Sequence, residues 1–246
     1  MQASPHPGPR VSVVIAVLNE AENVAAVLDE LLAALDGGPA FEVLFVDDGS
    51  TDATAAMIQD LMRTRLAVRL LRHDRRCGKT AALRTGIAAA RGEWIGTMDG
   101  DGQNDPADIV RMLAAGLAAP VPAPIVAGIR RRRRDTLSRR MATRFANTVR
   151  QAVLADRCPD TGCGLKAFRR DDFLRLPAFE GMHRFLPALF QTYGHPLLCL
   201  PVADRVRLRG VSKYTNFGRA LVGIGDLVGV IWLRSRTRLP ARVTES

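Results

Sequence analysis

A short glycine-rich turn near the middle of the chain has the composition of a cation site. The stretch Asp99-Gly100-Asp101-Gly102-Gln103 places two carboxylates and an amide oxygen directly after an apolar run that is typical of a buried strand. Hard divalent cations prefer oxygen ligands, and a turn of this kind leaves coordination positions open for a diphosphate. The pattern therefore predicts a divalent-cation site at Asp99, Asp101 and Gln103.

This turn has two other possible interpretations. An EF-hand is excluded, because its sixth position would be Asn104 rather than glycine and its twelfth Val110 rather than glutamate. A turn that only caps the helix expected to begin at Pro106 stays open as a structural alternative.

A second acidic pair follows another expected strand. Asp47 and Asp48 begin a turn that continues to Asp52, and their carboxylates can accept hydrogen bonds from a nucleobase N–H or from ribose hydroxyls. Thr51 and Asp52 have a structural alternative as caps of the following helix. The sequence therefore predicts a nucleotide-binding role for Asp47 and Asp48.

Two further polar stretches gain no catalytic role from the sequence. Gly78-Lys79-Thr80 is not a P-loop, because the first glycine of that motif would fall on His73. Lys79 is therefore expected only as a cation at the start of a helix. His183 and Arg184 form a polar pair that is expected to be structural.

The elements that position these residues alternate along the chain. Strands are expected at 11–17, 42–46, 68–71, 94–98, 125–129 and 165–168, and helices at 20–35, 53–62, 79–90, from 106 onward and at 137–154. This alternation predicts an α/β fold with a mostly parallel sheet flanked by helices. Ligands of such sheets bind beyond the carboxyl ends of the strands, where the acidic clusters at 19–20, 47–48 and 99–101 fall.

Composition sets further bounds on the class of protein. The 246 residues include 35 basic and 25 acidic side chains, a formal net charge of +10, and 47% are hydrophobic. A chain of this size and composition is expected to form one large α/β domain, and collagen, coiled-coil and disulfide scaffolds are excluded. The four cysteines form no C-x-x-C pair, which favours a reducing compartment. We find no secretory signal and no apolar stretch long enough for a membrane span.

Most of the positive charge comes from arginine, and five arginines run from Arg130 to Arg134. A GC-rich genome is one explanation of the arginine content, and an anionic partner is the other. The run itself is interpreted either as a solvated turn or as a contact for an acceptor phosphate or anionic lipid. Nucleic-acid binding is not expected, because no aromatic residues interleave with the run.

Taken together, the motifs resemble the inverting nucleotide-sugar glycosyltransferases of family two, which have the Rossmann-like GT-A fold. The similarity is greatest to the dolichyl-phosphate mannosyltransferase and polyprenyl-phosphate glycosyltransferase group, and it covers residues 11–219. Five stretches in the same order carry it: Val13 to Glu20, Val46 to Asp52, Asp99 to Gln103, Asp160 to Arg170 and Arg205 to Tyr214.

This resemblance implies a set of site residues. The nucleotide sugar would be bound by Ala16, Leu18, Glu20, Phe45, Asp47, Asp48, Asp99 and Gln103, and the acceptor or its phosphate by Arg130, Arg140, Arg205, Arg207 and Lys213. Asp101 would be the main ligand of Mg²⁺ or Mn²⁺, with Asp99 and Gln103 assisting, and Asp101, Arg130 and Arg207 would carry catalysis. Ala16 and Leu18 replace the proline and tyrosine usual in the group, and Asp204 replaces its frequent histidine, so the choice of donor stays open.

The function expected from the resemblance is metal-dependent transfer of a sugar from a GDP- or UDP-sugar to a polyprenyl phosphate. An ionised phosphate acceptor needs no general base, whereas a hydroxyl acceptor would need one, and the nearest candidate is Asp160. A hydroxyl-acceptor glycosyltransferase and a non-catalytic basic binding protein of the same fold are the alternatives.

The chain is expected to divide into a catalytic domain at 10–215 and an amphipathic tail at 216–246. The tail, with Trp232 and the arginines that follow it, is expected either to lie in a membrane interface or to pack on the domain or on a second subunit. The first alternative implies a peripheral protein on the cytoplasmic face of the membrane.

Overall fold

The computed structural model describes residues 8–131, 150–151, 154, 156–205 and 216–238. In the last of these segments, only the backbone is described for residues 216–224, and side chains are described from residue 225. Most of the helix expected at 137–154 lies outside these residues. So do three of the predicted site residues, Arg140, Arg207 and Lys213.

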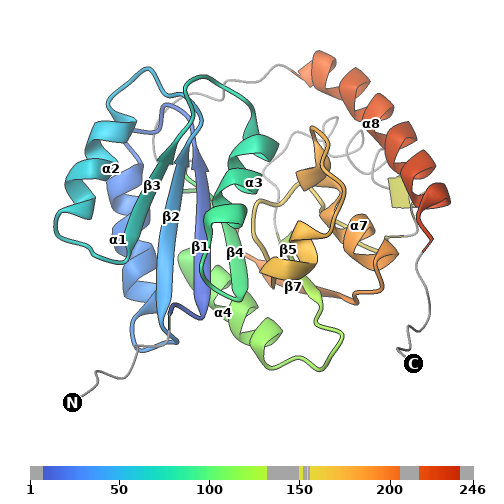
Figure 1. Ribbon diagram of the computed structural model, residues 1–246, viewed down its shortest axis with the longest axis horizontal. Coiled ribbons are helices and arrows are strands. Elements are labelled where there is room, and N and C mark those ends of the chain that lie inside the picture. The colour runs from blue at the N-terminus through green and yellow to red at the C-terminus, as the bar shows by residue number, and fades with distance from the viewer. Residues whose placement is uncertain (1–7, 132–149, 152–153, 155, 206–215, 239–246) are drawn as a thin grey trace, which may run out of the picture.

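The described residues form one seven-stranded sheet in the order β3-β2-β1-β4-β6-β5-β7 (Figure 1). Its strands are β1 (Val11–Val17), β2 (Phe41–Asp47), β3 (Val68–Arg72), β4 (Trp94–Asp99), β5 (Ile125–Arg130), β6 (Lys166–Arg169) and β7 (Leu197–Val202). Only β6 runs antiparallel to its neighbours among these strands. The expected mostly parallel α/β sheet is confirmed.

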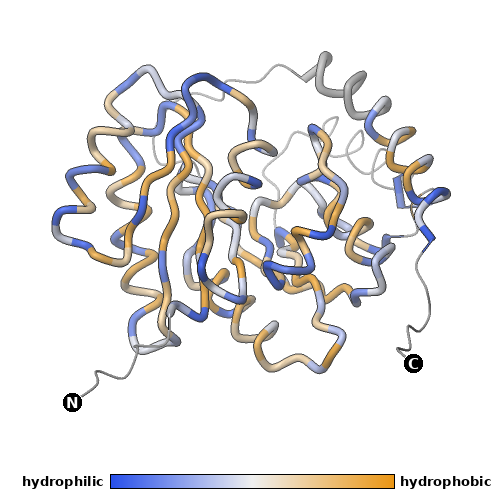
Figure 2. The backbone as a smooth tube through the Cα atoms, in the orientation of Figure 1, coloured by the Kyte–Doolittle hydropathy of each residue, from blue (hydrophilic) through white to orange (hydrophobic). Residues whose placement is uncertain are grey.

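Helices cover both faces of the sheet. One face packs against α1 (Val24–Leu35), α2 (Thr54–Met62) and α4 (Pro106–Leu117). The other packs against α3 (Lys79–Ala89), α6 (Arg170–Leu174), α7 (Leu186–Thr192) and the C-terminal part of α8 (Asn216–Arg236), with a 3₁₀ turn η1 at Met182–Arg184. Strands β1, β2 and β4 are largely apolar, as Figure 2 shows, because both of their faces are buried.

The register of the neighbouring strands β2, β1 and β4 brings the acidic strand ends together. Ala16 of β1 pairs with Asp99 of β4 on one side and with Val46 of β2 on the other, and Val17 pairs with Asp47. Only β1 lies between β2 and β4. Since neighbouring strands are about 4.8 Å apart, the ends of β2 and β4 are about 10 Å apart. The acidic residues that follow both strands therefore share one edge of the sheet.

Helix α1 begins four residues later than the sequence pattern predicts. Asn19 has a left-handed backbone conformation, with φ of 52°. The amides of Asn19 and Glu20 donate hydrogen bonds to Ser50 Oγ and Thr54 Oγ1, each at 2.8 Å. These bonds hold residues 19–23 as a turn against the loop after β2, so the helix starts at Val24.

The segment after β6 contains helices and a strand that the hydrophobic pattern of the sequence does not distinguish. It holds α6, η1, α7 and the edge strand β7, which pairs in parallel with β5. β7 has a proline, Pro201, and mostly half-buried side chains, so it lacks the alternation of a typical strand. Its place is determined by pairing with β5, which the local sequence does not reveal.

Helix α8 uses one face to pack on the rest of the structure. Leu227, Val230 and Leu233 pack against the core cluster to which α3 and α7 also contribute, and Val230 is fully buried. Arg234 Nε donates to Thr192 Oγ1 at 2.9 Å, and Asp226 forms an ion pair with Arg184 at 2.7 Å. Among the described residues, no helix combines the length and apolar character that crossing a bilayer requires.

Candidate active site

The turn after β4 gathers the predicted cation ligands. The amide of Gln103 donates to Asp101 Oδ1 at 3.1 Å, and the amide of Asp99 donates to Asn104 Oδ1 at 2.9 Å. The cap of α4 is a different residue, Asp105, whose carboxylate accepts the amide of Ala107 at 3.0 Å. Capping therefore does not require Asp99 or Asp101, and both stand at the carboxyl edge of the sheet with Gln103.

Asp99 forms an ion pair with Lys79, the first residue of α3. Both side chains are one-third exposed. Burial disfavours the charged form of Asp99, but the Lys79 ammonium outweighs it and lowers the pKa of the carboxyl. The same pair raises the pKa of Lys79 against the effect of its own burial. Asp99 is therefore ionised, which is the form that a cation requires.

A glycine allows the loop before β6 to approach Asp99. A Cβ atom on Gly164 would lie only 2.4 Å from Asp99 Oδ2, so any side chain there would displace the carboxylate. The Gly164 carbonyl in turn accepts a hydrogen bond from Thr97 Oγ1 at 2.8 Å. The loop at 160–166 therefore forms one wall beside the turn.

Lys166 supports this wall, whereas His183 joins η1 to the start of α3. Lys166 is buried and its Nζ donates to the carbonyls of Thr161 and Cys163, at 3.2 and 2.5 Å. Burial lowers the pKa of Lys166. His183 Nδ1 lies 2.8 Å from Thr80 Oγ1, and burial, with Lys79 and Lys166 nearby, lowers the pKa of His183 to about 3. His183 is thus neutral at physiological pH and links η1 to the start of α3.

Asp48 ties the end of β2 to the loop that leads into α3. Its carboxylate accepts the amides of Cys77 and Gly78, each at 2.8 Å, and lies 2.8 Å from His73 Nδ1. Asp48 and Asp99 thus hold consecutive residues, Gly78 and Lys79, from two strand ends. This arrangement fixes the start of α3 between the two acidic clusters.

The Asp47 side chain is engaged by residues of its own turn and of β3. Its side chain is fully buried, and its carboxylate accepts the amide of Ser50 at 2.9 Å and the Nε–H of Arg72 at 3.3 Å. Gly49 follows with φ of 77°, and a Cβ atom there would lie 2.6 Å from the backbone of Arg75. The turn at 47–50 and the loop at 73–78 are therefore in direct contact.

Arg130 and Asp160 form a bidentate ion pair at the end of β5. The Nε–Oδ2 and Nη2–Oδ1 distances are 2.7 and 2.8 Å, and both side chains are largely buried. Burial opposes the charge on Arg130, but its hydrogen bonds to Asp160 outweigh this effect and raise the pKa of the guanidinium. Asp160 therefore serves as a partner of Arg130 in this structure.

The later basic motif reaches the turn after β4 through its backbone. The amide of Arg205 donates to the Gln103 carbonyl at 3.0 Å. The Arg205 guanidinium pairs with Glu30 at 2.5 Å and with Asp105 at 2.8 Å, and these contacts raise its pKa. Arg205 is thus joined to α1 and to the capping residue of α4.

The remaining predicted residues divide into two groups. Ala16, Leu18 and Glu20 lie at or just beyond the end of β1, between the two acidic clusters. Phe45 is fully buried in the core between the sheet and α1, so its side chain has no exposed surface with which to line a nucleotide pocket.

Sequence reasoning missed the role of Lys79 and Gly164. Lys79 follows β3 and starts α3, so its position at the carboxyl edge could have been inferred from the parallel sheet. No sequence pattern indicated the role of Gly164. It precedes an antiparallel strand, β6, and the approach of Gly164 to Asp99 depends on tertiary packing.

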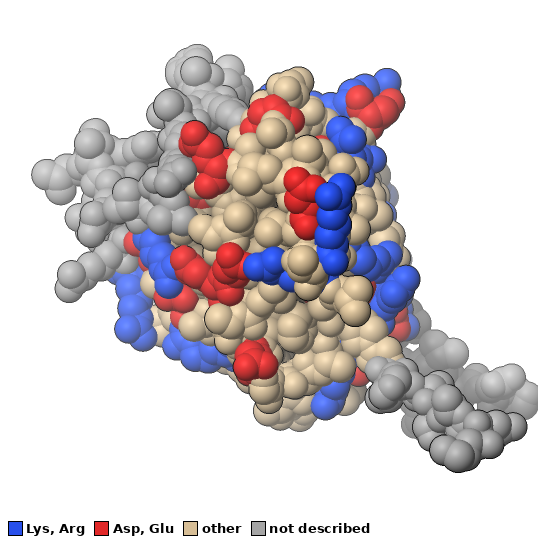
Figure 3. All heavy atoms as spheres, turned by 90° about the vertical axis from the view of Figure 1, so that its left-hand side faces the viewer, with Lys and Arg blue, Asp and Glu red and all other residues tan. Residues whose placement is uncertain are grey.

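The surface does not concentrate positive charge on the face that α1 and α2 cover. In Figure 3, the basic side chains of this face lie beside acidic ones. One such pair joins Arg65, after α2, to Asp29 of α1 at 2.6 Å. On this view of the described residues, the net positive charge forms no continuous patch.

Comparison with known proteins agrees with this fold. The model of the family "Glycosyl transferase family 2" matches residues 12–176, and the chain belongs to this family. The expected family is therefore confirmed.

Two curated relatives are polyprenyl-phosphate sugar transferases by name. Dodecaprenyl-phosphate galacturonate synthase of Rhizobium johnstonii is 34% identical over 90% of this chain. Undecaprenyl-phosphate 4-deoxy-4-formamido-L-arabinose transferase of Pseudomonas aeruginosa is 34% identical over 91% of it. The match spans 66% of the length of each relative.

Two solved structures share the fold. Glucosyl-3-phosphoglycerate synthase from Mycobacterium tuberculosis, solved with Mn²⁺, UDP and phosphoglyceric acid, has a TM-score of 0.66 at 20% identity and covers 94% of this chain and 80% of its own. Mannosyltransferase PcManGT from Pyrobaculum calidifontis, solved with GDP-Man and Mn²⁺, has a TM-score of 0.64 at 23% identity and covers 96% of this chain and 67% of its own. The expected GT-A fold is confirmed.

The ion pair between Arg130 and Asp160 generates a stability prediction. Asp160→Asn leaves the buried guanidinium without its countercharge and is expected to lower the free energy of unfolding by about 3 kcal/mol. Urea denaturation monitored by circular dichroism measures this change. Asp171→Asn, which removes the partner of Arg170 in an exposed pair, is the control and should cost less than about 1 kcal/mol. Equal small effects of the two substitutions would contradict a structural role for Asp160.

Proposed function

We propose that this chain transfers a sugar from a GDP- or UDP-sugar to a polyprenyl phosphate, with inversion at the anomeric carbon. The observation that carries the proposal is the turn after β4, where Asp99, Asp101 and Gln103 stand at the carboxyl edge of the sheet. Only β1 separates this turn from the end of β2, where Asp48 lies. The names of the curated relatives support the acceptor, and the ligands of the solved neighbours support the donor and the cation.

The donor set of the turn fits Mg²⁺ or Mn²⁺. Asp99, Asp101 and Gln103 offer only hard oxygen ligands, and Asp99 is held ionised by Lys79. A cation bound here supplies charge neutralisation for the donor diphosphate and for the leaving phosphate in the transition state. Asp48, Ala16 and Leu18 would bind the nucleoside at the neighbouring strand ends.

A phosphate acceptor fits the surroundings of Asp160. A hydroxyl acceptor needs a general base within hydrogen-bond reach, and both oxygens of Asp160 are engaged by Arg130. A phosphate monoester has a second pKa near ~6, so it is already ionised at neutral pH and attacks without a base. Attack from the face opposite the leaving diphosphate inverts the anomeric carbon.

Basic side chains would reduce the repulsion between the two phosphate groups. Arg130 lies at the end of β5, beside the loop at 160–166 that borders Asp99. We assign Arg140, Arg207 and Lys213 to the acceptor phosphate as well, and these three residues lie outside the described residues. Fixed charges that face the developing charge stabilise the transition state more than they stabilise the ground state.

The cation site generates a prediction for activity. Asp101→Ala is expected to lower transfer by at least about 100-fold while leaving the circular dichroism spectrum unchanged, because charge on the leaving phosphate loses its stabilisation. Transfer is measured as radiolabelled sugar that partitions into organic solvent in the presence of undecaprenyl phosphate and Mg²⁺ or Mn²⁺. Asp60→Ala, an exposed carboxylate on α2, is the control and should keep full activity.

Three outcomes of the same assay would contradict parts of the proposal. Metal-dependent transfer by Asp101→Ala at the wild-type rate would contradict the cation site. Label that enters a water-soluble glycan rather than the organic phase would replace the phosphate acceptor by a hydroxyl acceptor. Absence of both transfer and donor hydrolysis would favour the non-catalytic binding protein.

We further propose that the catalytic domain at 10–215 is held on the cytoplasmic face of the membrane by the tail at 216–246. The face of α8 opposite its packed residues carries Val228 and Trp232, which are 60% and 61% exposed, with Ile231 beside them. Arg236 follows in the last turn and is exposed, whereas Arg234 lies on the packed face and donates to Thr192. An exposed apolar stripe with an arginine near its end supports binding in a lipid interface.

Liposome flotation tests this anchor. Wild-type protein is expected to float with vesicles that contain anionic phospholipids, and Val228→Ser with Trp232→Ser to lower its recovery several-fold, because the variant loses apolar surface that would enter the interface. Leu66→Ser is the control, since Leu66 is 98% exposed but lies in the loop after α2. Equal recovery of the double variant and the wild type would contradict the anchor.

A further inference from the structure

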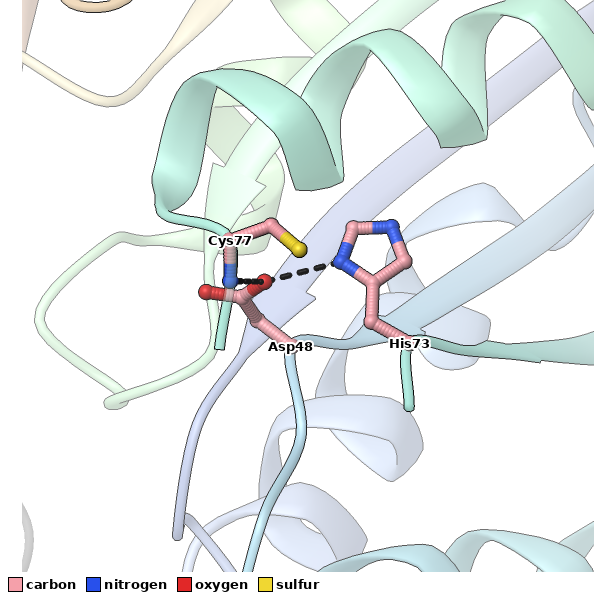
Figure 4. Close-up of side chains that lie close together, drawn as sticks. All are labelled: Asp48, His73 and Cys77. Carbon is pink, nitrogen blue, oxygen red and sulfur yellow. Dashed lines mark hydrogen bonds and ion pairs between the residues drawn. The ribbon is translucent and has the colours of Figure 1, made fainter. Parts of the chain in front are cut away.

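Three side chains with different metal-binding atoms converge beside the carboxyl end of β2. Asp48, His73 and Cys77 each place one ligand atom within 4.8 Å of the other two. Figure 4 shows the three side chains lying close together. Asp48 is buried, His73 is half-buried and Cys77 is exposed, so the cluster opens to solvent on its sulfur side. None of the three belongs to the turn after β4.

The chemistry of this set differs from that of the turn at Asp99. A carboxylate oxygen, an imidazole nitrogen and a thiolate sulfur form the mixture that Zn²⁺ binds, whereas Mg²⁺ prefers oxygen ligands alone. Three protein ligands leave a fourth position open, which is the pattern of an exchangeable site rather than a closed structural one.

The geometry requires only a small adjustment. Tetrahedral bonds of about 2.0–2.3 Å place ligand atoms roughly 3.3–3.8 Å apart. The Asp48–His73 pair, at 2.8 Å, would open slightly as a metal takes the place of the proton on Nδ1, which moves to Nε2 of the same ring by exchange with solvent. The sulfur, within 4.8 Å, would turn inward. Cys77 now directs its thiol to the Arg75 carbonyl at 3.4 Å, a weak contact on an exposed side chain.

The neighbours of the cluster hold its ligands in position. His73 Nε2 lies 3.0 Å from Thr85 Oγ1, so a ring bound to metal through Nδ1 keeps its proton on Nε2, facing the hydroxyl. Asp48 is fixed by the amides of Cys77 and Gly78. The two loops are in contact at Gly49, where a side chain would meet Arg75 and Arg76.

We propose that Asp48, His73 and Cys77 form a second metal site, which binds one thiophilic divalent cation such as Zn²⁺. Binding releases the thiol proton of Cys77 to solvent, and the thiolate, the neutral imidazole and the carboxylate then share the cation. A further consequence rests on the proposed function, in which Asp48 binds the nucleoside of the donor. A cation bound to Asp48 then competes with the nucleotide sugar and inhibits transfer.

Cobalt spectroscopy tests the site without any sugar donor. Metal-free protein is titrated with Co²⁺ in excess Mg²⁺, so that the turn at Asp99 is filled by the harder ion. We expect one equivalent of Co²⁺ to produce a thiolate-to-cobalt charge-transfer absorption that Zn²⁺ abolishes. Cys77→Ser should eliminate the band, and His73→Gln should weaken the affinity at least about 10-fold. Cys199→Ser, the other cysteine that is not buried, is the control and should keep the band.

The outcomes separate this site from the proposed function. Absence of the band in the wild type, or a band that persists in Cys77→Ser, would overturn the site whether or not the chain transfers sugars. Where the site is present, Zn²⁺ is expected to weaken the binding of UDP or GDP in the wild type but not in Cys77→Ser. Equal nucleotide binding with and without Zn²⁺ would overturn the competition alone.

Discussion

The start of α3 is held by two carboxylates from two different strands, and the geometry of the site depends on this constraint. Asp48, just after β2, accepts the amides of Cys77 and Gly78, and Asp99, at the end of β4, pairs with Lys79. β1 lies between these strands and contributes Ala16 at the same level. Charge and hydrogen bonding therefore fix the distance between the expected nucleoside and cation positions.

The same interaction explains why the acidic strand ends are stable in the absence of a ligand. Two carboxylates at one edge of a sheet repel each other unless cations or amides compensate them. Lys79 compensates Asp99, and backbone amides compensate Asp48. We expect the divalent cation to bind at the adjacent turn, with Asp101 and Gln103.

Much of the N-terminal half could be predicted from the sequence. The alternation of apolar runs and amphipathic stretches up to residue 117 reports directly on buried parallel strands and their covering helices, and it gave β1 to β4 within one residue at each end. The acidic clusters were correctly placed at one edge, because parallel strands end on the same side. Helix α1 was predicted too long, because the turn at 19–23 is imposed by Ser50 and Thr54 from another element.

The later part of the chain could not be resolved in this way. β7 is an edge strand with a proline, so its pairing with β5 carries no local pattern. The pairing of Arg130 with Asp160, and of Arg205 with Glu30 and Asp105, also depends on tertiary contacts between distant residues. The motifs identified these arginines as important, but only the structure shows that their guanidinium groups are bound by carboxylates.

The most direct test of the account is the position of a bound cation. Crystals of the protein grown with MnCl₂ and UDP or GDP can be measured at a wavelength where manganese scatters anomalously. The account predicts a peak contacted by Asp101, with Asp99 and Gln103 beside it and the diphosphate completing the coordination. A diphosphate bound without manganese at this turn, or manganese bound only elsewhere, would contradict it.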